Sequence, residues 1–227
     1  MCVLCFFYFE VIYMPFPFDL ELIWTSLPLL GVGALVTIEI TAVAVACGVF
    51  IGLFVGIAEL SNYKWLRIPA KVYVDFIRGT PLLVQIFIIY FALPTILGMR
   101  IEPFIAAVTA CSINSGAYVA EIFRAGIQSI DRGQMEAGRS LGMTWNQTMI
   151  YIIIPQAFRR IIPQLGNEFI AMLKDSSLVS VIGFEELTRK GQLVIASTYG
   201  SLEIWTAVAI SRIVAMLEKK FNPKRKV

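Results

Sequence analysis

Three polar residues recur at helical spacing in an otherwise apolar segment, residues 103–123. Asn114, Tyr118 and Glu121 stand at i, i+4 and i+7, which places them on one face of a helix. An amide, a phenol and a carboxylate offer both donors and acceptors of hydrogen bonds, which is the chemistry that binds a zwitterionic amino acid. Because polar side chains are costly within a membrane span, this face predicts a path for a polar solute. The alternative role is hydrogen bonding between packed helices.

A second set of polar residues interrupts the apolar segment at about residues 161–183. Lys174 and Asp175 break the apolar run, and two serines follow them. The candidates for the same solute path in this segment are Gln164, Glu168, Asp175 and Ser176. Interhelical hydrogen bonding is again the alternative role.

The stretch 134–156 is polar and glycine-punctuated in its first half and apolar in its second. It predicts two short helices hinged at Gly142, because glycine adopts the left-handed backbone conformation that ends a helix. Thr144 suits the N-cap position of the second helix, and Pro155 predicts a break or kink before the next span. Such a compact pair with an apolar edge suits the groove of a partner protein. Lying on lipid headgroups is the alternative.

Enzymatic chemistry finds no support in the sequence, which offers no evident pairing of a nucleophile with a base. The chain contains 4 cysteines and no histidine, which leaves little scope for a metal site. The phosphate-cradling pattern of Gly, four residues and Gly-Lys-Ser/Thr is absent from the sequence. We therefore predict that the chain is not an enzyme and that it binds no metal, cofactor or nucleotide directly.

The elements that carry these residues are predicted to be membrane helices. The sequence is 58% hydrophobic and 15% charged, well beyond the balance of soluble domains, so we expect an all-α integral membrane protein. A helical span needs about 20 apolar residues. The predicted spans are residues 31–58, 81–97 with a backward extension through 71–77, 103–123, about 161–183, and 202–217. Thr80 and Pro81 predict that a helix starts or restarts within the second span.

Basic residues orient these spans, because short loops rich in Lys and Arg stay in the cytoplasm. Residues 62–79, residues 124–160 and the tail from residue 218 are rich in them, whereas the first twenty residues contain none. The N-terminus is therefore expected outside and the C-terminus in the cytoplasm, with the stretch 134–156 in the longest inner loop. Arg78 is expected to anchor at the inner interface.

The stretch 134–156 resembles the EAA motif of ABC-importer permeases, which reads Glu-Ala-Ala, three residues, Gly, nine residues, then Ile, any residue and Leu-Pro. The positions that match are Glu136, Ala137, Gly142, Ile152 and Pro155. Gly138 replaces the second Ala and Ile154 replaces Leu, so a small or aliphatic residue is kept at each. The segments RGTPLLVQ, INSGAYVAEIFRAGI and GNEFIAMLKDSSLVSVIG are similar to the polar amino acid subfamily of these permeases.

The resemblance implies the fold of type I importer permeases, a bundle of about five transmembrane helices that works as a pair. Residues 1–26 would form an extracytoplasmic or interfacial segment, residues 27–217 the permease domain, and residues 218–227 a basic cytoplasmic tail. The coupling loop would cover residues from about 132 to 156. In the short last span Arg212 is unexpected; it would snorkel, line a dimer interface, or mark an impaired permease.

The resemblance also implies a transport subunit of the bacterial plasma (inner) membrane. An extracytoplasmic binding protein would deliver a polar amino acid, and two ABC ATPase subunits would bind ATP and Mg and supply the free energy. Glu136 would be the polar anchor to the ATPase, and Met135, Leu141 and Trp145 would supply apolar contact. The implied coupling residues are Met135, Glu136, Ala137, Gly138, Leu141, Gly142, Trp145 and Pro155.

Several alternatives remain open at this stage. A secondary transporter or channel would work from an ion gradient without an ATPase, and a membrane scaffold would keep the docking loop without moving solute. The second permease is either an identical chain or a close paralogue. The sequence does not distinguish Gln, Glu, Arg, His and cystine as cargo, since specificity would be shared with a separate binding protein.

Overall fold

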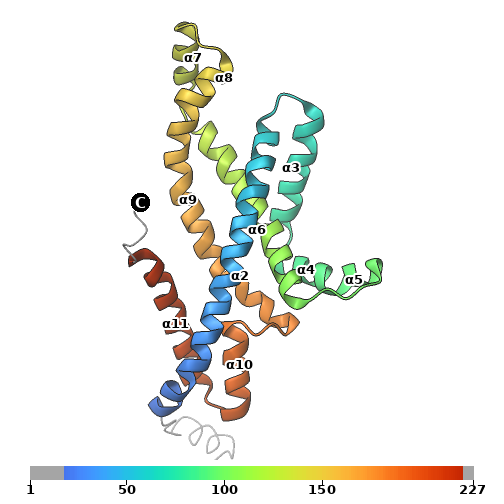
Figure 1. The fold of residues 1–227 in the computed structure, drawn as a ribbon, viewed down its shortest axis with the longest axis vertical. Helices are drawn as coiled ribbons and strands as arrows, with labels where there is room; N and C mark the ends of the chain where they lie inside the picture. Colours follow the sequence, from blue (N-terminus) through green and yellow to red (C-terminus); the bar gives the residue numbers. More distant parts are fainter. Residues whose placement is uncertain (1–17, 222–227) are drawn as a thin grey trace, which may run out of the picture.

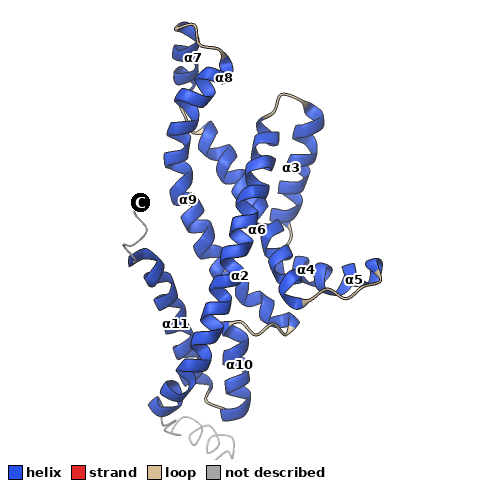
Figure 2. Ribbon diagram, viewed as in Figure 1, coloured by secondary structure: helices blue, strands red, loops and turns tan. Residues whose placement is uncertain are grey.

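The computed structural model describes residues 18–221. All regular secondary structure in this part is helical, as Figures 1 and 2 show. Most of the predicted segment 1–26 and the end of the predicted tail, residues 1–17 and 222–227, lie outside the described residues.

Helix α2 (Leu20–Leu60) runs along most of the length of the molecule in Figure 1. Its 41 residues extend roughly 60 Å at about 1.5 Å each, about twice the thickness of a membrane's hydrocarbon core. The carboxylate of Asp19 caps its start by accepting hydrogen bonds from two backbone N–H groups. The predicted span 31–58 lies within this helix, which begins at Leu20 instead. The predicted domain boundary after residue 26 therefore falls inside a continuous helix.

Helix α6 (Pro103–Gln128) packs closely along α2 and contains the third predicted span. Three glycines of α2, at positions 48, 52 and 56, lie one turn apart and face α6. A Cβ atom added at Gly48 would lie 2.8 Å from the side chain of Ser115, and one added at Gly52 would lie 2.6 Å from that of Val119. Because small residues let helix backbones approach, this stripe sets the spacing of the two helices.

The second predicted span is wrong as a single continuous helix. Helix α3 (Lys64–Gly79) meets the following helical segment, residues 82–97, at a bend of 104°. Thr80 has extended backbone angles, because a residue before proline is driven out of the helical region. Pro81 is also extended. The predicted restart is confirmed, with Pro81 rather than Thr80 at the N-cap position. The segment consists of α4 (Leu82–Phe87), the π-helix η1 (Ile88–Ala92) and α5 (Leu93–Leu97).

The second half of the chain folds into a row of helices joined by short turns. They are α7 (Arg132–Ser140), α8 (Trp145–Thr148), the π-helix η2 (Met149–Ile153), α9 (Ile154–Asp175), the 3₁₀-helix η3 (Ser176–Ile182), α10 (Leu187–Thr198) and α11 (Ser201–Phe221). The predicted break at Lys174 and Asp175 is confirmed, because α9 ends at Asp175. Helix α10 is absent from the sequence-based prediction, in which its residues formed a connection.

Membrane-spanning character is clearest for two helices of the described part, α2 and α6, while the bent pair at residues 64–97 could make a third span. Helices α9 and α11 fall short of the same test of length and apolarity. Charged residues explain this, since α9 carries Arg159, Arg160 and Glu168 and α11 carries Glu203, Arg212 and Glu218. The total of about five spans stays a prediction.

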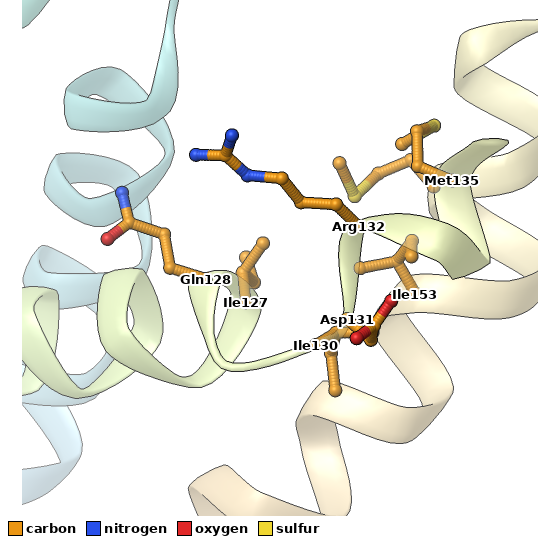
Figure 3. A pocket seen from close by; sticks show the side chains of 8 residues that line it. Ile127, Gln128, Ile130, Asp131, Arg132, Met135 and Ile153 are labelled. Atoms are coloured by element: carbon orange, nitrogen blue, oxygen red, sulfur yellow. The ribbon is translucent and has the colours of Figure 1, made fainter.

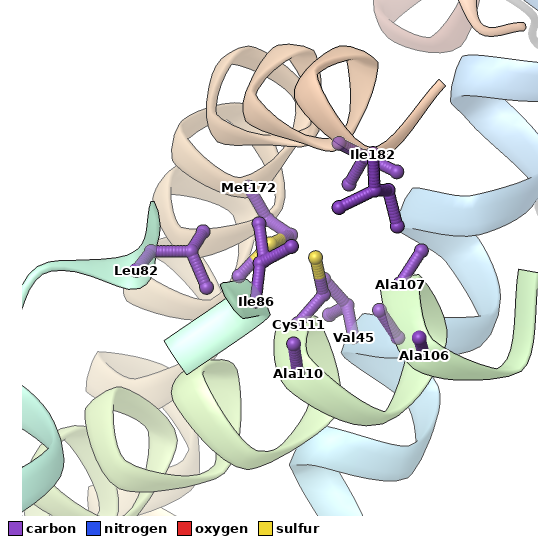
Figure 4. Packing of buried hydrophobic residues seen from close by; sticks show 11 residues of the cluster. Val45, Leu82, Ile86, Ala106, Ala107, Ala110, Cys111, Met172 and Ile182 are labelled. Carbon is purple, nitrogen blue, oxygen red and sulfur yellow. The ribbon is translucent and has the colours of Figure 1, made fainter. Parts of the chain in front are cut away.

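A buried apolar cluster joins the elements that carry the candidate residues, as Figure 4 shows. It brings together side chains of α2, α4, α6, α9 and η3. Its members are Ala44, Val45, Leu82, Ile86, Ala106, Ala107, Ala110, Cys111, Met172, Val179 and Ile182. The cluster fixes α4 and the end of α9 against the first half of α6, which precedes the polar residues from Asn114 onward.

Candidate functional site

The stretch predicted as the coupling loop forms a hairpin of two short helices at one end of the molecule (Figure 1). Asp131 caps α7 by accepting the N–H of Gly133, and Gly142 has a φ of 83° in the turn that follows α7. Thr144 and Gln147 form a capping box, in which each side chain bonds the backbone of the other. The hinge at Gly142 and the N-cap at Thr144 are therefore confirmed.

Gly138 lets the two helices of the hairpin touch. A Cβ atom at this position would lie 2.6 Å from the Cγ2 atom of Thr148 and 2.8 Å from its Oγ1 atom. Thr148 is itself fully buried. The departure from the second Ala of the motif thus fits the close packing of α7 on α8.

Large apolar side chains stand out at the tip of the hairpin. Leu141 is 81% exposed and Trp145 is 54% exposed. Glu136 and Ala137 are exposed too, and the Glu136 carboxylate has no hydrogen-bond or ion-pair partner among the described residues. Met135 was expected to offer apolar contact to a partner, but it packs inward against the buried cluster of α6 and α9. It therefore supports the loop from beneath.

A cavity of about 400 Å³ lies beside the hairpin, as Figure 3 shows. It opens between the end of α6, the start of α7 and η2. Its lining residues are Ile127, Gln128, Ile130, Asp131, Arg132, Met135, Met149 and Ile153. The guanidinium of Arg132 makes no hydrogen bond or ion pair with another described residue.

The break predicted at Pro155 takes the form of a π-helical turn. The π-helix η2 ends at Ile153, and Pro155 stands in the first turn of α9. Because proline has no N–H to donate, the helix loses one hydrogen bond there and the preceding turn widens. The same arrangement precedes Pro94, where η1 occupies residues 88–92. The chain stays helical from Trp145 to Asp175, so α8 and α9 form one connected rod.

Asn114 of the polar face is buried and holds a structural bend. Its amide donates to Oε1 of Gln85 at 3.1 Å. The Gln85 amide in turn donates to the backbone oxygens of Ile77 at 2.9 Å and Thr80 at 3.1 Å, on the α3 side of the bend. Asn114 therefore makes a hydrogen bond between helices, and through Gln85 it supports the bend between α3 and α4. Sequence reasoning missed Gln85, although a glutamine in an apolar helix just after Pro81 was a usable signal.

Tyr118 and Glu121 lie on a more open part of the same face, next to Arg78. The guanidinium carbon of Arg78 lies 5.3 Å from the Tyr118 ring centroid, and its Nη1 atom lies 3.9 Å from Oε2 of Glu121. Arg124 donates to Glu121 at 2.9 Å, and the Glu121 side chain is 27% exposed. Arg78 thus contacts the polar face and is more than an interface anchor. The group offers opposite charges side by side.

The candidates on α9 and η3 do not form one cluster. Gln164 and Asp175 are exposed, whereas Glu168 and Ser176 are buried. The Ser176 hydroxyl donates to the backbone oxygen of Leu173 at 2.9 Å and so finishes the end of α9. Glu168 interacts with the side chain of Ser115 on α6. Among the described residues, no hydrogen bond or ion pair joins the four candidates to Asn114, Tyr118 or Glu121.

Arg212 turns into the bundle, so it does not snorkel. Its guanidinium donates to Oγ1 of Thr188 at 2.9 Å and to the backbone oxygen of Lys174 at 3.2 Å. It also lies 3.5 Å from the carboxylate of Glu186, whose side chain is fully buried. Sequence reasoning missed Glu186.

A separate ion pair lies nearby at the start of α10. The ammonium of Lys190 hydrogen-bonds the exposed Glu185 and lowers the pKa of that carboxyl.

Sequence comparisons agree with this geometry. A profile of the family described as binding-protein-dependent transport system inner membrane component matches residues 48–217. The glutamine transport system permease protein GlnP of Escherichia coli is 46% identical over 209 residues, which cover 92% of this chain and 95% of that protein. The arginine transport system permease protein ArtQ of Bacillus subtilis is 40% identical over 178 residues, which cover 78% of this chain and 81% of that protein.

A structural comparison supports the same conclusion. A chain in the structure described as "crystal structure of an amino acid ABC transporter with histidines" superposes with a TM-score of 0.85 at 46% identity. The match covers 89% of this chain and 94% of that chain, which confirms the predicted permease fold. The chain therefore belongs to the family of inner membrane components of binding-protein-dependent transport systems, as a permease of the amino acid ABC transporter type, a transport subunit rather than an enzyme.

Proposed function

We propose that this permease imports a polar amino acid delivered by an extracytoplasmic binding protein, and that a separate ABC ATPase drives it by docking on the α7–α8 hairpin. The observation that carries the proposal is the exposed tip of that hairpin, with Leu141 81% and Trp145 54% exposed. Burial of each such side chain contributes about 1.5–3 kcal/mol to docking. Glu136, which lacks a partner among the described residues, would supply the polar contact.

Movement of the ATPase would reach the membrane through a stiff connection. The capping box and the close contact at Gly138 hold α7 and α8 together. Helix α8 continues without a non-helical residue through η2 into α9, which carries Glu168 and ends at Asp175. A displacement at Trp145 would therefore tilt or shift α9 as a lever and bias the bundle between inward-open and outward-open states.

The proposed assembly follows from what the chain lacks and from its charge pattern. ATP and Mg would be bound by the ATPase subunits, because the sequence has no phosphate-cradling motif. The basic loops support an orientation with the hairpin in the cytoplasm and the N-terminus outside, and the chain would cross the membrane about five times. A second permease, identical or paralogous, would complete the path, and lipid would surround the pair.

The amino acid would pass the open part of the α6 face. Its carboxylate would meet Arg78 and its ammonium would meet Glu121, which lie side by side at 3.9 Å and keep partial exposure. Tyr118 would line the same contact. Relatives named for glutamine and arginine transport support a polar amino acid as the cargo. On α9 and η3, Gln164, Glu168, Asp175 and Ser176 remain the proposed second part of the path.

Co-purification in mild detergent tests the coupling directly. The ATPase subunit should accompany the wild-type permease and be lost when Glu136→Ala and Gly142→Asp are combined. A suitable control is Glu21→Ala, which removes an exposed carboxylate from the first turn of α2, at the end of the molecule away from the hairpin (Figure 1). Retention of the ATPase by the double variant would overturn the proposal. Uptake into vesicles driven by an ion gradient alone would favour a secondary transporter instead.

A further inference from the structure

Helix α11 carries a charge where an apolar residue is expected. Arg212 stands in the middle of the helix, and its side chain is only 16% exposed. Its three hydrogen-bond acceptors belong to two elements: Lys174 at the end of α9, and Glu186 and Thr188 at the start of α10. Arg212 therefore links α11 to α9 and α10 at once.

The two oxygens of the Glu186 carboxylate have different partners. Its Oε1 atom accepts the N–H of Arg189 at 2.8 Å and so caps α10. Its Oε2 atom faces the Thr37 hydroxyl of α2 at 3.4 Å and the Arg212 guanidinium at 3.5 Å. Because the side chain is fully buried, Arg212 is the cation that compensates this charge.

The contact with Lys174 connects helix α9, the proposed lever, to Arg212 and Glu186. The Lys174 oxygen lies in the last turn of α9, where it also accepts the Ser177 hydroxyl at 2.7 Å, so the Arg212 guanidinium is a further donor at this helix end. The negative end of the helix dipole favours a guanidinium there. Arg212 thus donates a direct hydrogen bond from α11 to the far end of the rod that begins at Trp145.

We propose that Arg212, held by Glu186, is the joint through which movement of α9 reaches α10 and α11. It is a positioning residue, which acts on transport through α9 and touches no substrate. The proposal rests on the proposed lever from the α7–α8 hairpin to α9. It predicts that removal of the joint separates ATP hydrolysis from transport even when the fold is intact.

A double-mutant cycle first separates the charge pair from the fold. Arg212→Leu leaves the Glu186 carboxylate unpaired, and Glu186→Gln leaves the guanidinium unpaired. Each single change should lower the thermal midpoint of the purified permease by about 5–10 °C, whereas the double variant should stay within about 3 °C of the wild type. Arg100→Leu, at an exposed arginine with no partner among the described residues, is the control. If a single variant cannot be purified, the amounts of the single and double variants in the membrane fraction are compared instead. The double variant should then be more abundant than either single variant.

Transport by the double variant then tests the joint itself. The complex with ATPase and binding protein should hydrolyse ATP at the wild-type rate. The number of amino acids transported per ATP should fall by about fivefold or more. A stable double variant with the wild-type ratio would overturn the proposal, as would additive losses of stability in the cycle. Failure of the proposed function has a different signature, because the wild-type complex would then show no ATP-dependent uptake.

Discussion

At the scale of single residues, Gly142 is the position where backbone conformation and exposure meet. Its φ of 83° lies in the left-handed region, and no atom stands within 4 Å of an added Cβ. A side chain there is therefore strained by the backbone and at the same time projects into the proposed docking surface. The consequence of a substitution should be felt at the ATPase contact and hardly at all in the bundle.

Gly142→Asp should uncouple transport without preventing membrane insertion. The added carboxylate places a charge beside Leu141 in a surface that must be desolvated on docking. We expect ATP-dependent uptake in vesicles with binding protein to fall about tenfold or more, with normal abundance in the membrane. Gly98→Asp is a matched control, because Gly98 also has positive φ, 68°, and open space around it. Full transport by Gly142→Asp would contradict the account.

We expect the α6 face to contain a structural residue, Asn114, and a proposed transport residue, Glu121. Glu121→Gln should raise the KM of uptake about tenfold, because the substrate ammonium loses a charged acceptor. Asn114→Ala should lower the thermal midpoint and leave KM unchanged, because the Asn114 amide donates to Gln85, away from Arg78 and Glu121. Uptake kinetics and thermal unfolding of the two variants decide this. The reverse pattern, with KM sensitive to Asn114 and insensitive to Glu121, would contradict it.

At the scale of elements, the sequence predicted the helices and breaks that depend on neighbouring residues. The apolar run of α6, the hinge at Gly142 and the break after Lys174 all follow from residues next to one another. The bend at Thr80 was only half predicted, because Pro81 signals a restart but no sequence rule gives its 104° angle. Helix α10 was missed, since its charged and polar residues resemble a connection.

The packing of α7 on α8 gives a prediction at this scale. Gly138→Ala should push the two helices apart and cost about 1–3 kcal/mol of stability, because the new methyl group meets Thr148. Adding Thr148→Ala should restore most of the loss in the thermal midpoint. Gly166→Ala, at a helical position with nothing within 4 Å of the new atom, should be neutral or slightly stabilising. An equal loss in Gly138→Ala with and without Thr148→Ala would refute the packing argument.

At the scale of the whole molecule, the hairpin and the α10–α11 end lie at opposite ends of one rod, helical from Trp145 to Asp175 (Figure 1). The motif in the hairpin could be recognised from spacing, whereas the partners of Arg212 and Asn114 could not. Those contacts join residues far apart in the chain, such as Thr37 and Glu186, which are 149 positions apart. No periodicity encodes such a pairing, because it depends on how the helices cross.

A photo-crosslinking residue at position 141 tests the central claim most directly. Leu141 is 81% exposed at the tip of the hairpin, so a photoreactive side chain there should give a covalent adduct with the ATPase subunit in membranes that contain both proteins. The same side chain at position 202, where Leu202 is 61% exposed at the opposite end, should give none. Absence of an ATPase adduct at position 141, or equal adducts at both positions, would contradict the account.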